Sequence, residues 1–326
     1  MIDPSALTGK IRAALTPCSL GKWPTPLETA MQLAEANDLQ ALWIKREDVS
    51  SGTYGGSKVR GLEFLLAGAA PGTVYVTVGG SGSTHCLATA LQAATLKHAT
   101  VVAQFPQPAT DETLAIAAAC RRAARRVVCA RWRAALPLAV AHAWIVAQGL
   151  GSARWIPGGG ANPRGVVGQL LGGLELAIQV SDPPDAIVVP LGSGGTAAGL
   201  VLAMRTLGWS TRVIGVRVAP VIVANRWHVA ALARGAARLL ARLGVTLPDC
   251  DSTALIVLDG IGAGYGHPSA AGETARALAA TCGMVLEPTY GAKAFAALPA
   301  VAKRGFRRVV FWHTFASPSS VLERTA

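Results

Sequence analysis

The sequence contains no run of about 18 uncharged apolar residues, the length that a membrane-spanning helix requires. Residues 1–10 also lack the apolar core of a signal peptide. The six cysteines are scattered along the chain and form no Cys-x-x-Cys pair, which argues against a zinc site. We therefore predict a cytoplasmic protein with no membrane partner, no bound metal and reduced, mostly buried cysteines.

Acidic residues are scarce. The 326 residues include 18 Asp and Glu against 30 Lys and Arg, which gives a formal net charge of +12. Arginines cluster in residues 121–133 and again in residues 304–308. Such a surface either binds nucleic acid or is a solvated face that attracts anionic ligands. Because no nucleic-acid-binding module is recognisable, we predict no nucleic-acid partner.

Short β-branched segments alternate with longer amphipathic segments. This alternation predicts an α/β fold with open parallel sheets and helices on both faces. The glycine run 158–160 is typical of a crossing between two lobes. Predicted strands cover residues 41–45, 74–78, 100–104, 126–129, 186–190, 212–217, 254–258 and 308–312, and predicted helices cover residues 59–68, 84–95, 111–123, 137–148, 164–179, 197–207, 222–243, 270–281 and 292–303.

One lysine, Lys58, stands at the end of a loop of small residues, just before an amphipathic helical pattern. The glycines of the loop leave space for a ligand, and the helix dipole disfavours a cation at this end. Both conditions suit an amine that loses a proton and forms a Schiff base. A phosphate-binding or surface lysine would explain the same pattern.

A second glycine cluster, Gly192-Ser193-Gly194-Gly195-Thr196, connects a hydrophobic strand to a helix. Converging N–H groups, the helix N-terminus and two hydroxyls favour an anion there, so the pattern predicts a phosphate cradle. The cluster lacks the Lys-Ser/Thr ending of a nucleotide P-loop, and Ala197 breaks the dinucleotide fingerprint. The alternative is a tight turn that binds no ligand.

A third glycine loop, residues 79–84, also stands between a strand and a helix, and its N–H groups suit a carboxylate. Ser83 either carries a proton or only caps the helix. His85 is typical of a packing or hydrogen-bonding residue rather than a catalyst.

Two of the four tyrosines, Tyr265 and Tyr290, lie in glycine-containing turns on the side of the predicted sheet where α/β ligand sites occur. Each either serves such a site or only caps a buried polar group. Thr314 adds a hydroxyl at the end of the last predicted strand.

Together these motifs resemble the fold-type II pyridoxal-phosphate enzymes, and in particular the family of D-cysteine desulfhydrase and 1-aminocyclopropane-1-carboxylate (ACC) deaminase. The resemblance extends over residues 23–314. Its most specific part is Lys45-Arg46-Glu47-Asp48 followed by the Gly-Gly-x-Lys-x-Arg pattern at residues 55–60. Residues 192–200 and 286–293 match almost as well.

The resemblance implies the cofactor pyridoxal 5'-phosphate, with Lys58 as the Schiff-base lysine. The implied cofactor-binding residues are Lys58, Thr84, Gly192, Ser193, Gly194, Gly195, Thr196 and Thr314, and the implied catalytic residues are Lys58, Ser83, Tyr265 and Tyr290. It also implies a large domain of residues 1–55 and 161–326, a smaller inserted domain of residues 56–160 that carries the lysine, and a homodimer.

Three positions depart from the family pattern. Thr84 replaces an asparagine expected beside the phenolic oxygen of the cofactor. Gly291 replaces a glutamate that, in ACC deaminases, can hold the pyridine nitrogen protonated, so Thr314 is the remaining hydroxyl for that nitrogen. Phe315 adds bulk near the ring. The loss of the glutamate argues against ring-opening deamination, because that reaction needs a strong electron sink.

The sequence therefore predicts a lyase that removes the β-substituent and the amino group of a small polar amino acid, as D-cysteine desulfhydrase does. ACC, cysteate and D-serine are alternative substrates. The alternative that is not an enzyme is a paralogue that binds the cofactor but converts no substrate.

Overall fold

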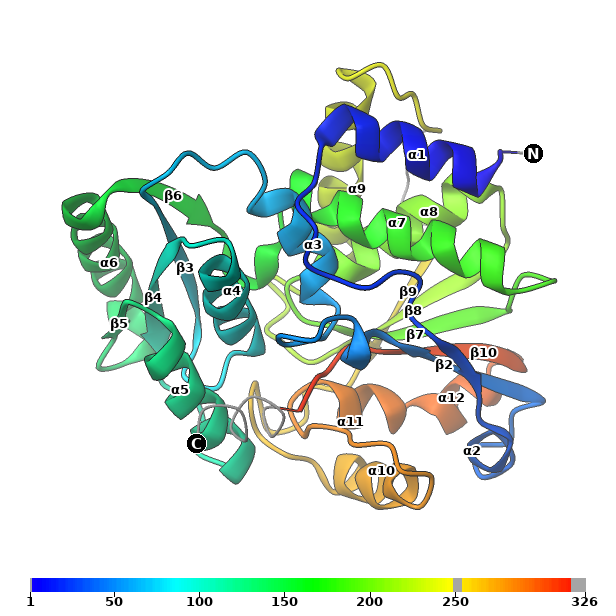
Figure 1. Ribbon diagram of the computed structural model, residues 1–326. Coiled ribbons are helices and arrows are strands. Elements are labelled where there is room, and N and C mark those ends of the chain that lie inside the picture. Colours follow the sequence, from blue (N-terminus) through cyan, green and yellow to red (C-terminus); the bar gives the residue numbers. More distant parts are fainter. Residues whose placement is uncertain (1, 249–253, 318–326) are drawn as a thin grey trace.

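The computed structural model describes residues 2–248 and 254–317. Figure 1 shows two sheets side by side, a larger one formed by early and late segments of the chain and a smaller one formed by its middle part. The larger sheet has the strand order β1-β2-β10-β7-β8-β9. Only β1 is antiparallel to its neighbour. Its strands are β1 Leu27–Thr29, β2 Ala41–Arg46, β7 Ala186–Leu191, β8 Arg212–Arg217, β9 Leu255–Asp259 and β10 Arg308–His313.

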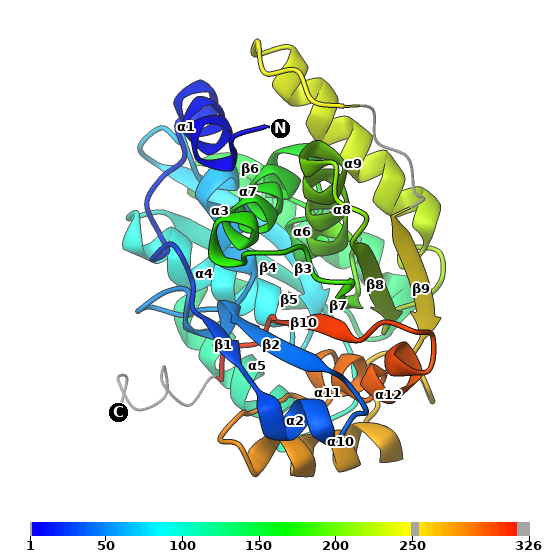
Figure 2. The ribbon, with the colours of Figure 1, turned by 90° about the vertical axis from the view of Figure 1, so that its right-hand side faces the viewer.

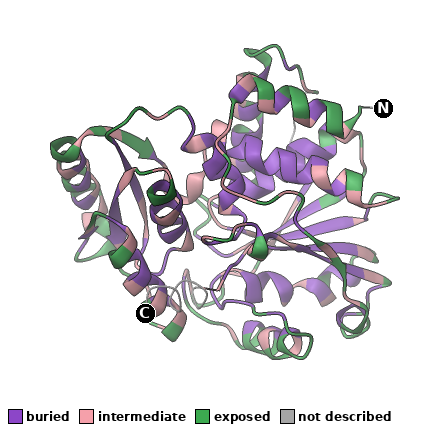
Figure 3. Cartoon of the chain, in the orientation of Figure 1, coloured by how far each residue is buried: buried purple, intermediate pink, exposed green. Residues whose placement is uncertain are grey.

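Both faces of the larger sheet are covered by helices, as Figure 2 shows. Successive residues of β7 point to opposite cores: Ile187 and Val189 to one, Ala186 and Val188 to the other. This explains why the strand is apolar throughout. Figure 3 shows the resulting buried layer. Helices α1 Pro4–Leu15, α7 Pro163–Gln179, α8 Gly195–Leu207 and α9 Arg226–Ala241 cover one face, and α2 Met31–Glu35, α10 Ala270–Ala280, α11 Gly291–Phe295 and α12 Leu298–Ala302 cover the other.

The smaller sheet is entirely parallel, in the order β5-β4-β3-β6. Its strands are β3 Thr73–Gly80, β4 Ala99–Phe105, β5 Arg126–Cys129 and β6 Ser152–Ile156. Helices α3 Lys58–Leu65, α4 Thr84–Thr95 and α5 Asp111–Ala123 pack on one face, and α6 Leu136–Leu150 packs on the other. Short 3-10 turns lie at Glu47–Val49, Arg133–Ala135 and Gly158–Gly160.

The eight predicted strands are confirmed within one or two residues at their ends. The sequence pattern does not predict β1 and β6, which are edge strands with mostly exposed residues and therefore carry little hydrophobic pattern. Nor does it predict α1, which Asp3 caps, or α2. The domain boundaries at residues 55–56 and 160–161 stay a prediction.

Three predicted helices need correction. The helix predicted for residues 59–68 ends at Leu65. The helix predicted for residues 222–243 begins only at Arg226, because Asn225 caps it by accepting a hydrogen bond from the His228 N–H at 2.8 Å. The helix predicted for residues 292–303 divides into α11 and α12.

The cysteines are less buried than predicted. Cys86 and Cys120 are buried, Cys18 is half-buried, and Cys129 and Cys282 are exposed. All five are free thiols, and Cys250 lies outside the described residues. In the described ranges, no helix is both long and apolar enough to cross a membrane.

Candidate active site

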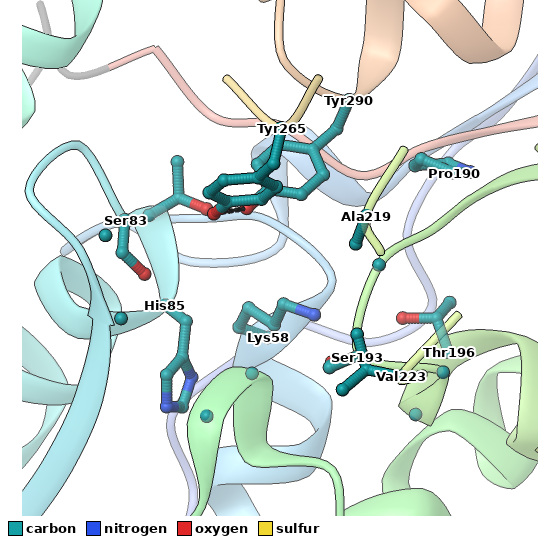
Figure 4. Close-up of a pocket in the computed structure, with 18 of the residues that line it drawn as sticks. Lys58, Ser83, His85, Pro190, Ser193, Thr196, Ala219, Val223, Tyr265 and Tyr290 are labelled. Atoms are coloured by element: carbon teal, nitrogen blue, oxygen red, sulfur yellow. Dashed lines mark hydrogen bonds between the residues drawn. The ribbon is translucent and has the colours of Figure 1, made fainter. Parts of the chain in front are cut away.

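A pocket of about 440 Å³ lies where the glycine loops of the two sheets face each other. Figure 4 shows its central side chains, with Lys58 between the Ser83 side and the Ser193 side, and the two tyrosines above it. The structure thus brings together every predicted site residue. The lining residues that carry the argument are Ser57, Lys58, Gly79, Gly80, Ser83, Thr84, Phe105, Arg133, Gly159, Gly192, Ser193, Gly194, Gly195, Thr196, Tyr265, Glu287, Tyr290 and Thr314.

Lys58 is the first residue of α3, and the preceding glycines determine where it lies. A Cβ at Gly55 would stand 2.0 Å from the Asp48 carbonyl oxygen, and Gly56 has φ +97° with the Thr314 carbonyl oxygen 2.9 Å from a Cβ position. Only glycine fits this close approach. Burial lowers the pKa of Lys58 from 10.5 to about 8. A substantial neutral amine fraction therefore exists near neutral pH.

The cluster at residues 192–196 has the geometry of an anion site. Gly194 adopts φ +84° and ends the turn, and α8 begins at Gly195 without a side-chain cap. The first N–H groups of a helix have no intrahelical partner, and here they line the pocket. With no acidic residue in the first turn of α8, the partial positive charge of this end is available to a phosphate.

Gly159 shows how closely the two lobes approach at this site. It has φ +69°, and a Cβ there would be 2.1 Å from the Ser193 Oγ and 4.0 Å from the Lys58 Nζ. The sequence predicts only a crossing at residues 158–160. Both Gly159 and Gly160 have positive φ, and the run of three adjacent glycines was the available signal of a close approach.

Ser83 and His85 lie at the N-terminal end of α4. Ser83 is its N-cap, and the Ser83 Oγ accepts a hydrogen bond from the Cys86 N–H at 3.3 Å while also lining the pocket. The His85 Nε2 is hydrogen-bonded to the Thr77 Oγ1 at 2.9 Å. Burial, together with the charge of Lys58, lowers the pKa of His85 to about 3, so its ring is neutral at neutral pH.

Tyr265 and Tyr290 share a hydrogen bond between their hydroxyls, and their rings meet edge to face at 6.0 Å. Burial raises the pKa of Tyr265 to about 12. Burial and the neighbouring Tyr265 also raise the pKa of Tyr290. Both hydroxyls therefore keep their protons at neutral pH, and the pair can donate a proton or a hydrogen bond into the pocket.

Glu287 is a pocket residue that the sequence analysis did not single out. Its carboxylate accepts hydrogen bonds from the N–H groups of Thr289, Tyr290 and Gly291 at 2.6–2.7 Å. Burial, opposed by these bonds, raises its pKa to about 7. An acidic residue directly before a Pro-Thr-Tyr turn was the available signal, because a carboxylate there can bind the N–H groups of the turn and hold Tyr290 in place.

A buried ion network supports the other side of α3. The Arg60 guanidinium binds the Glu47 carboxylate at 2.7 and 2.8 Å and the Glu175 carboxylate at 2.8 and 3.1 Å. Lys45 pairs with the same Glu175, and the Trp23 ring lies 3.9 Å from Arg60. Since Arg60 is two residues after Lys58, these bonds also fix the start of α3.

Comparison with known proteins agrees with this geometry. A sequence profile described as pyridoxal-phosphate dependent enzyme matches residues 18–314. The chain belongs to this family. It is an enzyme that uses pyridoxal phosphate, and the predicted family and cofactor are confirmed.

A D-cysteine desulfhydrase of Salmonella schwarzengrund (strain CVM19633) is 31% identical over 319 residues, which cover 91% of this chain and 92% of the relative. The crystal structure of an ACC deaminase homologue superposes with a TM-score of 0.80 at 27% identity, over 95% of each chain. Threonine deaminase isoform 2 from Solanum lycopersicum shares the fold, with a TM-score of 0.65 at 19% identity over 99% of this chain and 88% of that chain. The predicted fold type is thereby confirmed.

Proposed function

We propose that this enzyme is a lyase that removes the β-substituent and the amino group of a small polar amino acid, with D-cysteine as the favoured substrate. The products are pyruvate, ammonia and sulfide. The observation that carries the proposal is one pocket that holds an amine of lowered pKa, Lys58, and a protonated hydroxyl pair, Tyr265 and Tyr290. The substrate is supported by the curated relatives named D-cysteine desulfhydrase.

The residues present fit the cofactor. We assign its phosphate to residues 192–196, because uncapped N–H groups and the Ser193 and Thr196 hydroxyls line the pocket there. Lys58 is assigned as the covalent attachment point. The Thr314 hydroxyl is assigned to the pyridine nitrogen and Thr84 to the surroundings of the phenolic oxygen. When bound, pyridoxal phosphate withdraws electrons from the substrate Cα and so makes proton loss there feasible.

Different side chains then carry out the two proton transfers of the reaction. The uncharged Lys58 Nζ accepts the Cα proton, which its lowered pKa permits at neutral pH. Ser83 and the N–H groups of residues 79–83 orient the substrate carboxylate. The hydroxyl of Tyr290, held by Tyr265, donates a proton to the departing sulfur.

A second candidate substrate is ACC. It is favoured by the superposition on the ACC deaminase homologue and opposed by the glycine at position 291. We also propose a homodimer, on the family resemblance alone, and a cytoplasmic location, on the scattered cysteines of the sequence.

A substrate screen tests the function. The purified holoenzyme is mixed with D-cysteine, L-cysteine, D-serine, cysteate and ACC, and the 2-oxo acid is measured. We expect the highest kcat/KM with D-cysteine. Production of no 2-oxo acid from any of the five would refute the lyase assignment and favour a paralogue without turnover.

Borohydride reduction followed by peptide mass mapping tests the attachment point. We expect the reduced cofactor adduct on Lys58. The Lys58→Ala variant should lose both adduct and activity, whereas Lys10→Ala, at an exposed position of α1, should keep both. An adduct on another lysine would overturn the site.

A further inference from the structure

Lys293 is a buried lysine beside the pocket for which the proposed reaction has no role. It lies in the middle of α11 and is only 3% exposed. Its Nζ donates hydrogen bonds to the carbonyl oxygens of Ile261, at 2.7 Å, and Gly264, at 3.2 Å. Both acceptors belong to residues 260–266, the segment that carries Tyr265 and that we call the Tyr265 loop. Lys293 therefore connects α11 to the backbone directly before Tyr265.

The Tyr265 loop has little structure of its own to hold it. Four of its seven residues are glycines, and Gly262, Gly264 and Gly266 have positive φ. Such a segment loses much conformational entropy when it is ordered. Its internal turn is closed by a long hydrogen bond of 3.2 Å, from the Gly264 N–H to the Ile261 carbonyl. The two bonds from Lys293 act on the same two residues and add the support that the turn lacks.

Tyr290 is held by the same short helix. It is the residue directly before α11, and its N–H donates to the Glu287 carboxylate at 2.6 Å. Ala292, Ala294 and Phe295 of α11 are fully buried, so the helix is fixed in the core. One rigid segment thus carries Tyr290 at its start and binds the Tyr265 loop through Lys293. Figure 4 shows the two tyrosines that result side by side, with their hydroxyls in contact.

The hydroxyl pair depends on a short separation. A hydrogen bond between two hydroxyls needs an oxygen–oxygen distance of about 2.5–3.0 Å, so a shift of the Tyr265 loop by about 1 Å would break it. Burial lowers the pKa of Lys293, and the Glu287 carboxylate acts in the opposite direction. The charged and the neutral amine both have the two N–H groups that the carbonyls accept, so the contact does not depend on the charge.

We propose that Lys293 is a positioning residue for the tyrosine pair: through the carbonyls of Ile261 and Gly264 it holds the Tyr265 hydroxyl against that of Tyr290. The proposal rests on the proposed function, in which Tyr290 donates a proton to the departing sulfur. It adds to that reaction a residue that does not line the pocket.

Lys293→Met tests this role, because it keeps the apolar stem and removes the N–H groups. The two carbonyls each still accept one backbone N–H, so the fold should persist. The kcat and KM with D-cysteine are measured with and without Tyr265→Phe. We expect Lys293→Met alone to lower kcat about 10-fold with KM within about twofold. In Tyr265→Phe it should change kcat less than about twofold, because the hydroxyl that it positions is absent.

Lys45→Met is the matched control. Lys45 is also a buried lysine that donates to a backbone carbonyl, that of Thr25 at 2.8 Å, but it lies on β2 and has no contact with either tyrosine loop. Whatever its effect on kcat, the factor should be the same with and without the Tyr265 hydroxyl. Equal factors for Lys293→Met in the two backgrounds overturn the inference, because Lys293 would then support the fold in general.

Hydrogen exchange separates the two ideas if no amino acid is consumed. Amide exchange of peptides covering residues 260–267 is measured in the holoenzymes of the wild type, Lys293→Met and Lys45→Met. We expect exchange there to be about 10-fold faster in Lys293→Met and unchanged in Lys45→Met. Unchanged exchange in Lys293→Met overturns the inference, even if the lyase is active. Faster exchange without any turnover supports the positioning role and refutes only the proposed function.

Discussion

Removing the cofactor exposes the amine of Lys58 to direct titration, and its pKa is the most decisive property of this site. The amine is expected to titrate at about 8 instead of 10.5, because burial penalises the charged form. At pH 7 the neutral fraction is then about one in ten, against about one in three thousand for an ordinary lysine, a gain of roughly 300-fold. This gain lets the amine act as a base near neutral pH.

The assay is trace acylation of the cofactor-free protein across a pH series, followed by peptide mass mapping. The labelling of Lys58 is divided by that of Lys10, which is exposed on α1 and serves as the internal reference. We expect the ratio to be constant at lower pH and to fall to half of that value near pH 8, because the neutral fraction of Lys58 approaches its maximum there. A ratio that stays constant from pH 6 to pH 10 would refute the reasoning, because burial would then not neutralise the amine.

The same shift makes a prediction for stability. The unfolded chain binds the proton more tightly than the folded one, so the cofactor-free protein should gain stability as the pH rises from about 8 to about 10.5. Below pH 8 the penalty is complete and amounts to at most about 3 kcal/mol, since the side chain is partly open to the pocket. The variant Lys58→Met should lack this rise. The thermal unfolding midpoint of both proteins is measured over this pH range. If the midpoints of wild type and Lys58→Met change with pH in the same way, the lowered pKa of Lys58 is contradicted.

Three further substitutions test other parts of the site. Tyr290→Phe removes one hydroxyl of the pair, and kcat with D-cysteine should fall about 100-fold with a smaller change in KM. Gly159→Ala adds a Cβ 2.1 Å from the Ser193 Oγ, so the variant should lose bound cofactor on gel filtration. Arg60→Met leaves the Glu47 carboxylate buried without its cation, and the free energy of unfolding should fall by about 3–5 kcal/mol in urea titrations.

Each substitution has a matched control. Tyr75→Phe removes a buried hydroxyl bonded to the Leu66 carbonyl outside the pocket and should keep kcat. Gly208 has the same φ of +69° as Gly159, but the space around its Cβ position is open. If Gly208→Ala also loses the cofactor, backbone strain and not the contact with Ser193 is responsible. The double variant Arg60→Met with Glu47→Gln should recover part of the lost stability, and no recovery would show that the ion pair is not the cause.

The sequence by itself determined the alternation of strands and helices and the positions of the glycine loops, because both depend on local chemistry. A buried parallel strand is apolar over its whole length, as β7 is, and a turn at positive φ needs glycine, as Gly194 does. Lys58 could be identified as a site residue because its loop and its helix are adjacent in the chain.

Only the tertiary structure decided which distant residues meet. Tyr265 and Tyr290 could be suspected separately, but their shared hydrogen bond depends on how two loops pack. Lys293 and Gly264 are 29 residues apart in the chain and meet only through folding. Burial decided the charge state of Lys58 in the same way. Desolvation and pairing arise from contacts between segments far apart in the chain, and no local pattern encodes those contacts.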